Sequence, residues 1–206
     1  VSDMVLSPSD DIVISSSLDK TIRIWDLKSP NCQGIVHLPS PALINIDPQG
    51  LIFCIGSTNS HLKLYNLKSY DKGPFSTFDI KKFLRNSSFE WKKIKFSPDG
   101  TKIGIMTNSN ALLMVDSYSG DLLFTFSDFQ NQTGEVDFTY TPNGKFCICG
   151  SSNRMLHFIG METGELLFSK SSQHVNITNM LFNPVYALMA TAENFINLWL
   201  PDLDEQ

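Results

Sequence analysis

The chain has 206 residues, of which 42% are apolar, 11% aromatic and 18% charged. This composition supplies one substantial core or two small ones and excludes a disordered chain. The formal net charge of -5 argues against broad electrostatic affinity for nucleic acid or for an anionic membrane. Four cysteines in a chain of this length do not make a disulfide scaffold, so a reduced intracellular setting fits better.

The chain begins with a predicted strand that ends at a proline, and the same pattern returns four more times. The prolines follow one another at intervals of 40, 50, 44 and 42 residues. Apolar residues lie two and four positions before each proline, which is typical of a strand with one buried face. Proline cannot donate to a strand ladder and therefore ends the strand. The prolines and their apolar residues are Pro8 with Met4 and Leu6, Pro48 with Ile44 and Ile46, Pro98 with Ile94 and Phe96, Pro142 with Phe138 and Tyr140, and Pro184 with Met180 and Phe182.

Each repeat contains three to four short strands and no helical pattern of useful length. In the first repeat the predicted strands are Met4 to Ser7, Ile12 to Ser17, Thr21 to Leu27 and Cys32 to Leu38. Repeats of about 40 to 45 residues with four strands have the size of one β-propeller blade. The predicted repeats are residues 1–40, 41–80, 90–130, 134–172 and 174–206 of one domain covering 1–206, and the last repeat lacks its outer strand.

A second register runs through the same five repeats. It aligns Trp25, Tyr65, Val115, Ile159 and Trp199. Eight positions before each of these lies a hydroxyl residue, namely Ser17, Ser57, Thr107, Ser151 and Thr191. Six positions before each lies a hydrogen-bond acceptor, namely Asp19, Asn59, Ser109, Asn153 and Glu193. We expect these side chains to bond the indole N–H and the nearby backbone, because buried polar groups must be paired.

The string "SSSLDKTIRIWDL", with Ser17, Asp19, Trp25 and Asp26, resembles the signature of the WD-repeat family. The other copies are degenerate, and the family's Gly-His pair survives only as His174 in the last repeat. The resemblance implies an all-β WD-repeat β-propeller with a structural network of Ser17, Asp19, Trp25, Ser57, Asn59, Tyr65, His174, Thr191 and Trp199. The family's usual ring has seven blades, so we expect these five repeats to be the C-terminal part of such a ring. Closure as five blades and an open arc both remain alternatives.

Three longer strings are similar to one branch of the family, the adaptor subunit of COMPASS-type complexes that methylate the first lysine of the histone H3 tail. They are "SLDKTIRIWDLKSPNCQG" (17–34), "KLYNLKSYDKGPFSTF" (63–78) and "WLPDLD" (199–204). The resemblance implies a nuclear, non-catalytic adaptor that contacts a SET-domain methyltransferase subunit, the tail of RNA polymerase II or a phosphatase-targeting subunit. Adaptors of mRNA 3′-end processing or phosphatase complexes, and substrate receptors of ubiquitin ligases, remain alternatives. A fold alone does not decide among them.

The residue patterns predict no catalytic, metal-binding or cofactor-binding site, no direct contact with nucleic acid and no membrane span. No His pair has helical metal-ligand spacing, and no Walker, Gly-x-Ser-x-Gly or Gly-x-Gly-x-x-Gly string occurs. Cys147 and Cys149 share a strand face, where they are expected to act as small buried apolar residues. An enzyme with its site in a propeller channel would need a cluster of ionisable residues at the blade entrances, where Asn, Ser and single acids predominate.

The interval of 50 residues contains an insertion between Asp79 and Trp91, "DIKKFLRNSSFEW". Lys81, Lys82, Phe83 and Arg85 in it form a local basic and apolar patch on an acidic chain. A solvated loop with one packed aromatic explains this pattern. A contact for an acidic or phosphorylated partner segment is the functional alternative, because Arg and Lys pair with phosphate oxygens.

Overall fold

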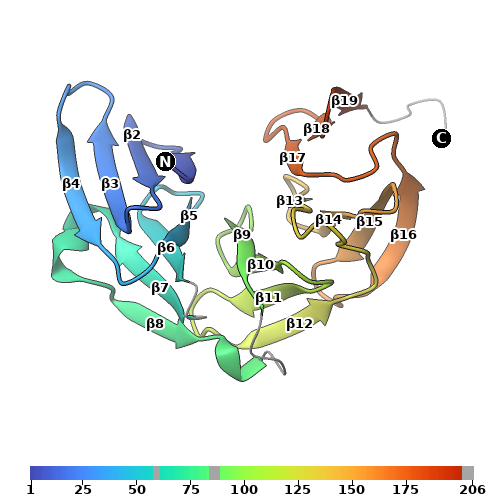
Figure 1. The fold of residues 1–206 in the computed structure, drawn as a ribbon, viewed down its shortest axis with the longest axis horizontal. Coiled ribbons are helices and arrows are strands. Elements are labelled where there is room, and N and C mark those ends of the chain that lie inside the picture. The colour runs from blue at the N-terminus through green and yellow to red at the C-terminus, as the bar shows by residue number, and fades with distance from the viewer. Residues whose placement is uncertain (58–60, 84–88, 201–206) are drawn as a thin grey trace. The chain divides into compact units, whose positions relative to one another are not determined.

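The computed structural model describes residues 1–57, 61–83 and 89–200. Within these residues the regular structure consists of antiparallel β-sheets and two short 3-10 helices (Figure 1). In each sheet the strands follow the chain order, so successive strands are joined by hairpin connections.

We call the five sheets blades 1 to 5. Blade 1 contains β1 (Asp3–Leu6), β2 (Ile12–Ser16), β3 (Thr21–Asp26) and β4 (Cys32–His37). Blade 2 contains β5 (Ala42–Ile46), β6 (Ile52–Ser57), β7 (His61–Asn66) and β8 (Ser76–Asp79), with the helix η1 (Leu67–Lys72) before β8. Blade 3 follows η2 (Lys81–Phe83) and contains β9 (Trp91–Phe96), β10 (Lys102–Thr107), β11 (Leu112–Asp116) and β12 (Leu122–Phe126). Blade 4 contains β13 (Phe138–Tyr140), β14 (Phe146–Gly150), β15 (Met155–Gly160) and β16 (Leu166–Ser171). Blade 5 contains β17 (Asn179–Phe182), β18 (Met189–Ala192) and β19 (Ile196–Trp199).

In blades 2 to 5 the turn that follows the proline-ended strand is held by a side chain at its start. In blade 2, Asp47 Oδ1 accepts hydrogen bonds from the backbone N–H groups of Leu51 and Ile52, both at 2.7 Å. Gly50 has φ of 71°, a left-handed conformation that favours glycine. Blade 3 repeats the arrangement with Ser97, whose Oγ accepts from the N–H of Lys102 at 2.9 Å. The recurrent polar-Pro-x-Gly pattern therefore builds one tight turn between the first two strands of a blade.

The chain divides into two compact units. The first contains residues Val1–Ile105 and Val115–Leu122. Its core lies between blades 1 and 2, where β2 and β3 supply isoleucines that contact those of β5 and β6. The buried side chains of this cluster are Ile14, Ile22, Ile24, Ala42, Ile44, Ile46, Phe53, Ile55, Tyr65 and Leu67. Burial of this kind supplies the main favourable term for joining two blades.

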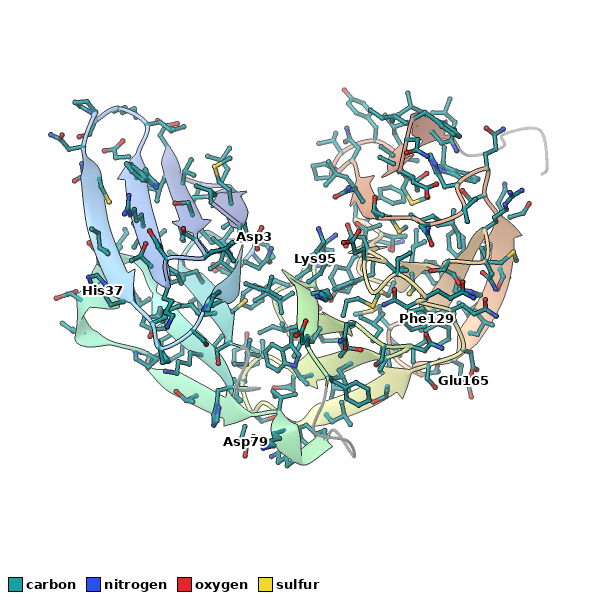
Figure 2. All side chains as sticks on the ribbon, viewed as in Figure 1. Asp3, His37, Asp79, Lys95, Phe129 and Glu165 are labelled. Atoms are coloured by element: carbon teal, nitrogen blue, oxygen red, sulfur yellow. The ribbon has the colours of Figure 1, made fainter. Side chains whose placement is uncertain are left out.

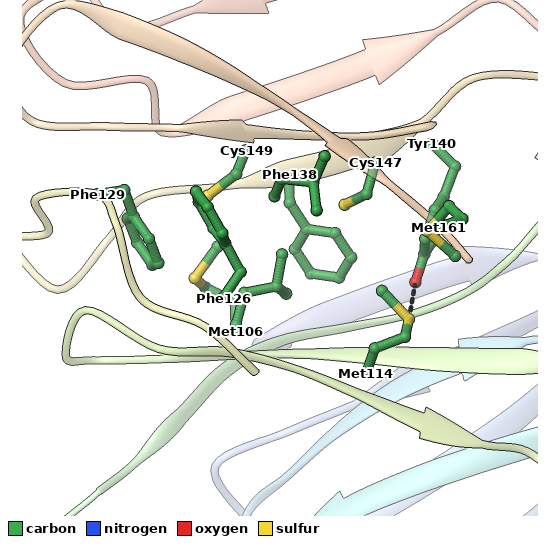
Figure 3. Close-up of a cluster of buried hydrophobic side chains, with 11 residues drawn as sticks. Met106, Met114, Phe126, Phe129, Phe138, Tyr140, Cys147, Cys149 and Met161 are labelled. Atoms are coloured by element: carbon green, nitrogen blue, oxygen red, sulfur yellow. Dashed lines mark hydrogen bonds between the residues drawn. The ribbon is translucent and has the colours of Figure 1, made fainter. Parts of the chain in front are cut away.

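The second compact unit contains Met106–Met114 and the described residues from Leu123 onward. One cluster joins the end of β10, β11 and the region after β12 to blade 4 (Figure 3). In it the Tyr140 hydroxyl donates to Met114 Sδ at 3.5 Å. A second cluster joins blades 4 and 5 through Ile148, Leu156, Ile177, Met180 and Met189. Each unit thus buries apolar strand faces between adjacent sheets.

The predicted all-β fold with five β-propeller blades is confirmed, and the four strands expected in blade 1 match β1–β4 within one residue at each end. The predicted buried face is correct in blades 2 to 4, and in blade 5 Met180 is buried while Phe182 is half-buried. It is wrong in blade 1, because Met4 is 67% and Leu6 58% exposed. In blades 2, 4 and 5 this face packs against the preceding blade, whereas the described residues leave Met4 and Leu6 uncovered. No described helix is long and apolar enough to cross a membrane.

Candidate functional site

The basic and apolar segment after β8 presents its two described lysines to solvent. Asp79 Oδ1 accepts from the N–H of Lys81 at 3.0 Å and so holds the first turn of η2. Lys82 Nζ lies 4.6 Å from the centre of the Phe83 ring, within the range of a cation–π contact. The Phe83 ring is half-buried, while both lysines are exposed. Arg85, the fourth residue predicted for this patch, lies outside the described residues.

The segment is anchored on its apolar side by the residue between Asp79 and the lysines. Ile80 is fully buried, and its carbonyl accepts from the N–H of Phe83 at 3.0 Å. Because this anchor holds the backbone, the two ammonium groups extend from a fixed turn. They can pair with carboxylate or phosphate oxygens of a partner.

The polar network predicted for the repeats is most complete in blade 5. Trp199 Nε1 donates to Thr191 Oγ1 at 3.0 Å, and His174 Nε2 donates to the Thr191 carbonyl at 3.2 Å. Both His174 and Thr191 are fully buried. Glu193 accepts from the N–H groups of Val175 and Asn176 at 3.1 and 3.3 Å. These bonds tie the β18–β19 hairpin to the segment that leads into β17.

In blade 1 the tryptophan has a different partner from the one expected. Trp25 Nε1 donates to Ser15 Oγ at 2.9 Å, and Ser15 takes the place expected for Ser17. The cause is hairpin length. Trp25 is opposite Val13, twelve residues earlier, whereas Trp199 is opposite Met189, ten residues earlier. In both hairpins the indole N–H donates to the residue two positions after the one opposite the tryptophan. A fixed spacing of eight residues before the tryptophan therefore predicts the correct hydroxyl only in blade 5.

Ser17 and Asp19 instead hold the β2–β3 turn. Asp19 Oδ1 accepts from the N–H and the hydroxyl of Thr21 at 3.0 and 2.7 Å, and Ser17 Oγ accepts from the N–H of Asp19 at 3.3 Å. The bonds from Thr21 hold the pKa of the Asp19 carboxyl below its usual range. Asp19 also lies 3.5 Å from Arg23 in an exposed ion pair.

Blade 2 has a ring stack where blades 1 and 5 have an indole hydrogen bond. Tyr65 is buried and stacks on Phe53 with ring centres 5.2 Å apart. Ser57 is buried at the end of β6, where it is opposite Ala42. Asn59, the third network residue expected in this blade, lies outside the described residues. At the aligned aromatic position, the described residues of this blade therefore show a ring stack.

A set of polar side chains that the sequence pattern did not predict joins the first strands of neighbouring blades. Asp3 Oδ2 accepts from the N–H of Ile44 at 3.2 Å, and Asp137 Oδ2 accepts from the N–H of Met180 at 2.9 Å. Burial raises the pKa of Asp3, although the N–H groups that bond it act in the opposite direction. Figure 2 labels Asp3 among the side chains of β1.

A signal for this set exists in the sequence. Asp3 and Asp137 both lie five positions before the proline of their blade, and each bonds the N–H that lies four positions before the next proline. Blades 2 and 3 use a variant of the device, in which Asn45 Oδ1 accepts from the N–H of Phe96 at 2.9 Å. These acceptors satisfy backbone donors that a blade cannot satisfy alone.

The candidates for metal and redox chemistry lie in structural positions. Cys147 and Cys149 are fully buried and part of the apolar cluster of Figure 3. Burial raises the pKa of the Cys149 thiol. His157 Nδ1 lies 2.8 Å from Ser169 Oγ. Among residues 1–57, 61–83 and 89–200, no group of three or more His, Cys, Asp or Glu has a geometry that could hold a metal ion.

Comparison with known proteins places these blades in a family. The family model described as "WD domain, G-beta repeat" matches residues 1–26. WD repeat-containing protein 82 of Drosophila melanogaster is 38% identical over 204 residues, which cover 98% of this chain and 63% of that protein. The Set1 complex component swd2 of Schizosaccharomyces pombe is 34% identical over 183 residues, which cover 85% of this chain and 50% of that protein. The COMPASS component SWD2 of Saccharomyces cerevisiae is 27% identical over 220 residues, which cover 98% of this chain and 65% of that protein.

This chain therefore spans between half and about two thirds of the length of these relatives. The repeat in the sequence, the five antiparallel blades and the similarity along nearly the whole chain agree with one another. The chain belongs to the WD-repeat family.

Proposed function

We propose that the protein is a non-catalytic adaptor subunit of a nuclear histone H3 lysine methyltransferase complex of the COMPASS type, acting in transcription-coupled chromatin modification. The observation that carries this proposal is the similarity to two relatives that are named as components of the Set1 complex and of COMPASS. The matched residues cover 85% and 98% of this chain, so they extend through nearly all of the blades. WD-repeat blades are rigid scaffolds whose connections are free to bind other proteins.

The expected partner is the SET-domain subunit of the complex. The exposed lysines of η2 add a second class of partner, an acidic or phosphorylated segment such as the tail of RNA polymerase II or part of a phosphatase-targeting subunit. Lys81 and Lys82 extend from a turn that Asp79 and Ile80 hold in place, and that geometry favours pairing with phosphate oxygens.

Affinity purification of the tagged full-length protein followed by mass spectrometry tests the adaptor role. We expect a SET-domain protein to co-purify in stoichiometric amount. Recovery of mRNA 3′-end processing factors or a phosphatase without any SET-domain protein would instead favour the alternative adaptor role. Recovery of a ubiquitin ligase would favour a substrate receptor.

A charge-reversal variant tests the lysine segment within the same experiment. Lys81→Glu, Lys82→Glu and Arg85→Glu are combined, and the matched control combines Lys68→Glu, Lys72→Glu and Lys145→Glu, three exposed lysines elsewhere. Both variants change the net charge equally. We expect the first variant to lose an acidic or phosphorylated partner that the control retains. Unchanged recovery of every partner would contradict a binding role for the segment.

A further inference from the structure

A groove of about 320 Å³ lies between blade 2 and blade 3 within the first compact unit. It is bounded by the β5–β6 and β7–β8 connections of blade 2 and by the β9–β10 and β11–β12 connections of blade 3. Its lining combines apolar and polar side chains with two carboxylates, the buried Asp47 and the exposed Asp99. The apolar residues are Leu51, Ile52, Leu64, Phe75, Phe96 and Tyr118.

One wall is built by the non-repeat segment between β7 and β8. The helix η1 ends at Gly73, which has φ of 86° and donates its N–H to the Tyr70 carbonyl at 3.1 Å. Pro74 follows, and the N–H of Phe75 then donates to the Leu64 carbonyl at 3.0 Å. The Phe75 backbone is fixed in this way, while its ring is 58% exposed.

Tyr118, on the connection between β11 and β12, also lines the groove. Asp116 Oδ1 accepts from the N–H of Tyr118 at 2.8 Å, and the Ser117 hydroxyl donates to the Gly100 carbonyl at 2.7 Å. The Tyr118 side chain is nevertheless 78% exposed. Two aromatic rings therefore stand open to solvent on well-anchored backbones, and such rings are the residues that most often dominate binding at protein interfaces.

The charge of the groove is negative. The Asp47 carboxylate accepts from the backbone N–H groups of Gln49, Leu51 and Ile52. Asp99 accepts from the Ser97 hydroxyl and from the N–H and hydroxyl of Thr101. Within the described part of the chain, neither carboxylate has a basic partner within 4 Å. The lining residues include two acids and no base.

Each carboxylate can still accept a further hydrogen bond. A carboxylate has about four acceptor positions, and each of these two uses three. Burial acts to raise the pKa of Asp99, but the bonds from Ser97 and Thr101 outweigh it and the net shift is downward. The charge therefore persists at neutral pH and favours a cationic group from outside.

We propose that this groove binds an extended protein segment in which an aliphatic or aromatic residue lies next to a Lys or Arg. The apolar residue enters between the rings of Phe75 and Tyr118, and the cation faces Asp99 and Asp47. This partner differs in charge from the acidic segment proposed for Lys81 and Lys82, so the two surfaces bind different sequences. The carboxylates disfavour a phosphorylated segment at the groove by like-charge repulsion.

The test begins with selection of random 12-residue peptides displayed on phage against the full-length protein. A fluorescent copy of the enriched peptide is then titrated in a polarisation assay at two salt concentrations. We expect an enriched pattern of one apolar residue beside Arg or Lys, and affinity that falls as salt rises. Phe75→Ser and Tyr118→Ser are each expected to weaken binding at least tenfold, and Asp99→Asn at least threefold.

Tyr186→Ser is the matched control, because Tyr186 is an aromatic residue of blade 5 that is 70% exposed. It should bind the peptide as the unaltered protein does. Circular dichroism establishes whether each variant is folded. If one of the two aromatic variants does not fold, the other alone tests the proposal. Failure to enrich any peptide would overturn the proposal. So would an acidic pattern, or affinity that Phe75→Ser and Tyr118→Ser leave unchanged.

This outcome is separate from the adaptor role. A protein that co-purifies with a methyltransferase but binds no basic peptide would refute the groove alone. A protein that binds the basic peptide but recovers no SET-domain protein would refute the proposed complex alone.

Discussion

Asp137 offers the sharpest test of how neighbouring blades are joined. Its side chain is only 3% exposed, and it accepts from the backbone N–H groups of Phe138 at 2.8 Å and Met180 at 2.9 Å. Asp137→Ala removes both carboxylate oxygens that accept these two bonds. A hydrogen bond to a charged group contributes roughly 1.5 to 3 kcal/mol, and relief of the buried charge offsets part of the sum. We therefore expect the variant to have a free energy of unfolding that is lower by about 3 kcal/mol.

The assay is thermal unfolding of the full-length protein followed by circular dichroism. For a protein of this size, a loss of about 3 kcal/mol lowers the unfolding midpoint by roughly 6 to 12 °C. Asp137→Asn keeps one acceptor oxygen and should lower the free energy of unfolding by only about 1 kcal/mol. Asp128→Ala removes an exposed carboxylate with the same change of charge and should leave the midpoint nearly unaltered. A midpoint for Asp137→Ala within about 2 °C of the unaltered protein would refute the reasoning.

Three further predictions use the same thermal assay. Ser15→Ala should lower the free energy of unfolding by about 1 kcal/mol, because it removes the acceptor of the Trp25 indole N–H. Ser17→Ala should lower it by less. The reverse order would contradict the hairpin register. Gly34→Ala should lower the free energy of unfolding by about 1 kcal/mol, because the added methyl group meets the Tyr70 ring. The same substitution in a Tyr70→Ala background should cause no such decrease. An equal decrease in both backgrounds would contradict this contact. Burial lowers the pKa of His157 below 6.5, although Asp128 acts in the opposite direction. The contribution of neutral His157 to stability is therefore complete above about pH 6.5. It is lost as the pH falls from there to the folded-state pKa. His157→Gln should flatten this slope between pH 7 and 5, and an unchanged slope would contradict the assignment.

Much of the fold could be predicted because the repeat is local. A strand with apolar residues at alternate positions, ended by proline and a turn residue, recurs in every blade and needs no knowledge of distant contacts. The strands of blade 1 follow from this pattern. The exposure of Met4 and Leu6 does not follow from it, because a strand face is buried only if another sheet covers it.

The polar contacts were harder to predict because they depend on register. Trp25 bonds Ser15 and not Ser17, since two additional residues in the hairpin move the diagonal neighbour of the indole. The Asp3 and Asp137 contacts cross from one blade to the next, and only their shared spacing before a proline indicates them. A pattern within one repeat therefore predicts the strand more reliably than the partner of its side chains.

The groove between blades 2 and 3 could not be predicted from the sequence for a similar reason. Phe75 lies in the string 63–78 that the sequence analysis compares with one branch of the family, but its place in the groove follows only from the path that η1 and Gly73 set. Tyr118, which also lines the groove, lies in an ordinary turn, and its sequence context carries no signal of exposure. Sites formed by connections of two blades emerge only when the blades are placed side by side.

The proposed adaptor role is tested most directly by histone methylation in cells that lack the protein. Depletion should lower methylation of the first lysine of the histone H3 tail over transcribed genes while the SET-domain enzyme is still present. Re-expression of the unaltered protein should restore it. Unchanged methylation after complete depletion, with no SET-domain protein bound to the tagged protein, would contradict the account.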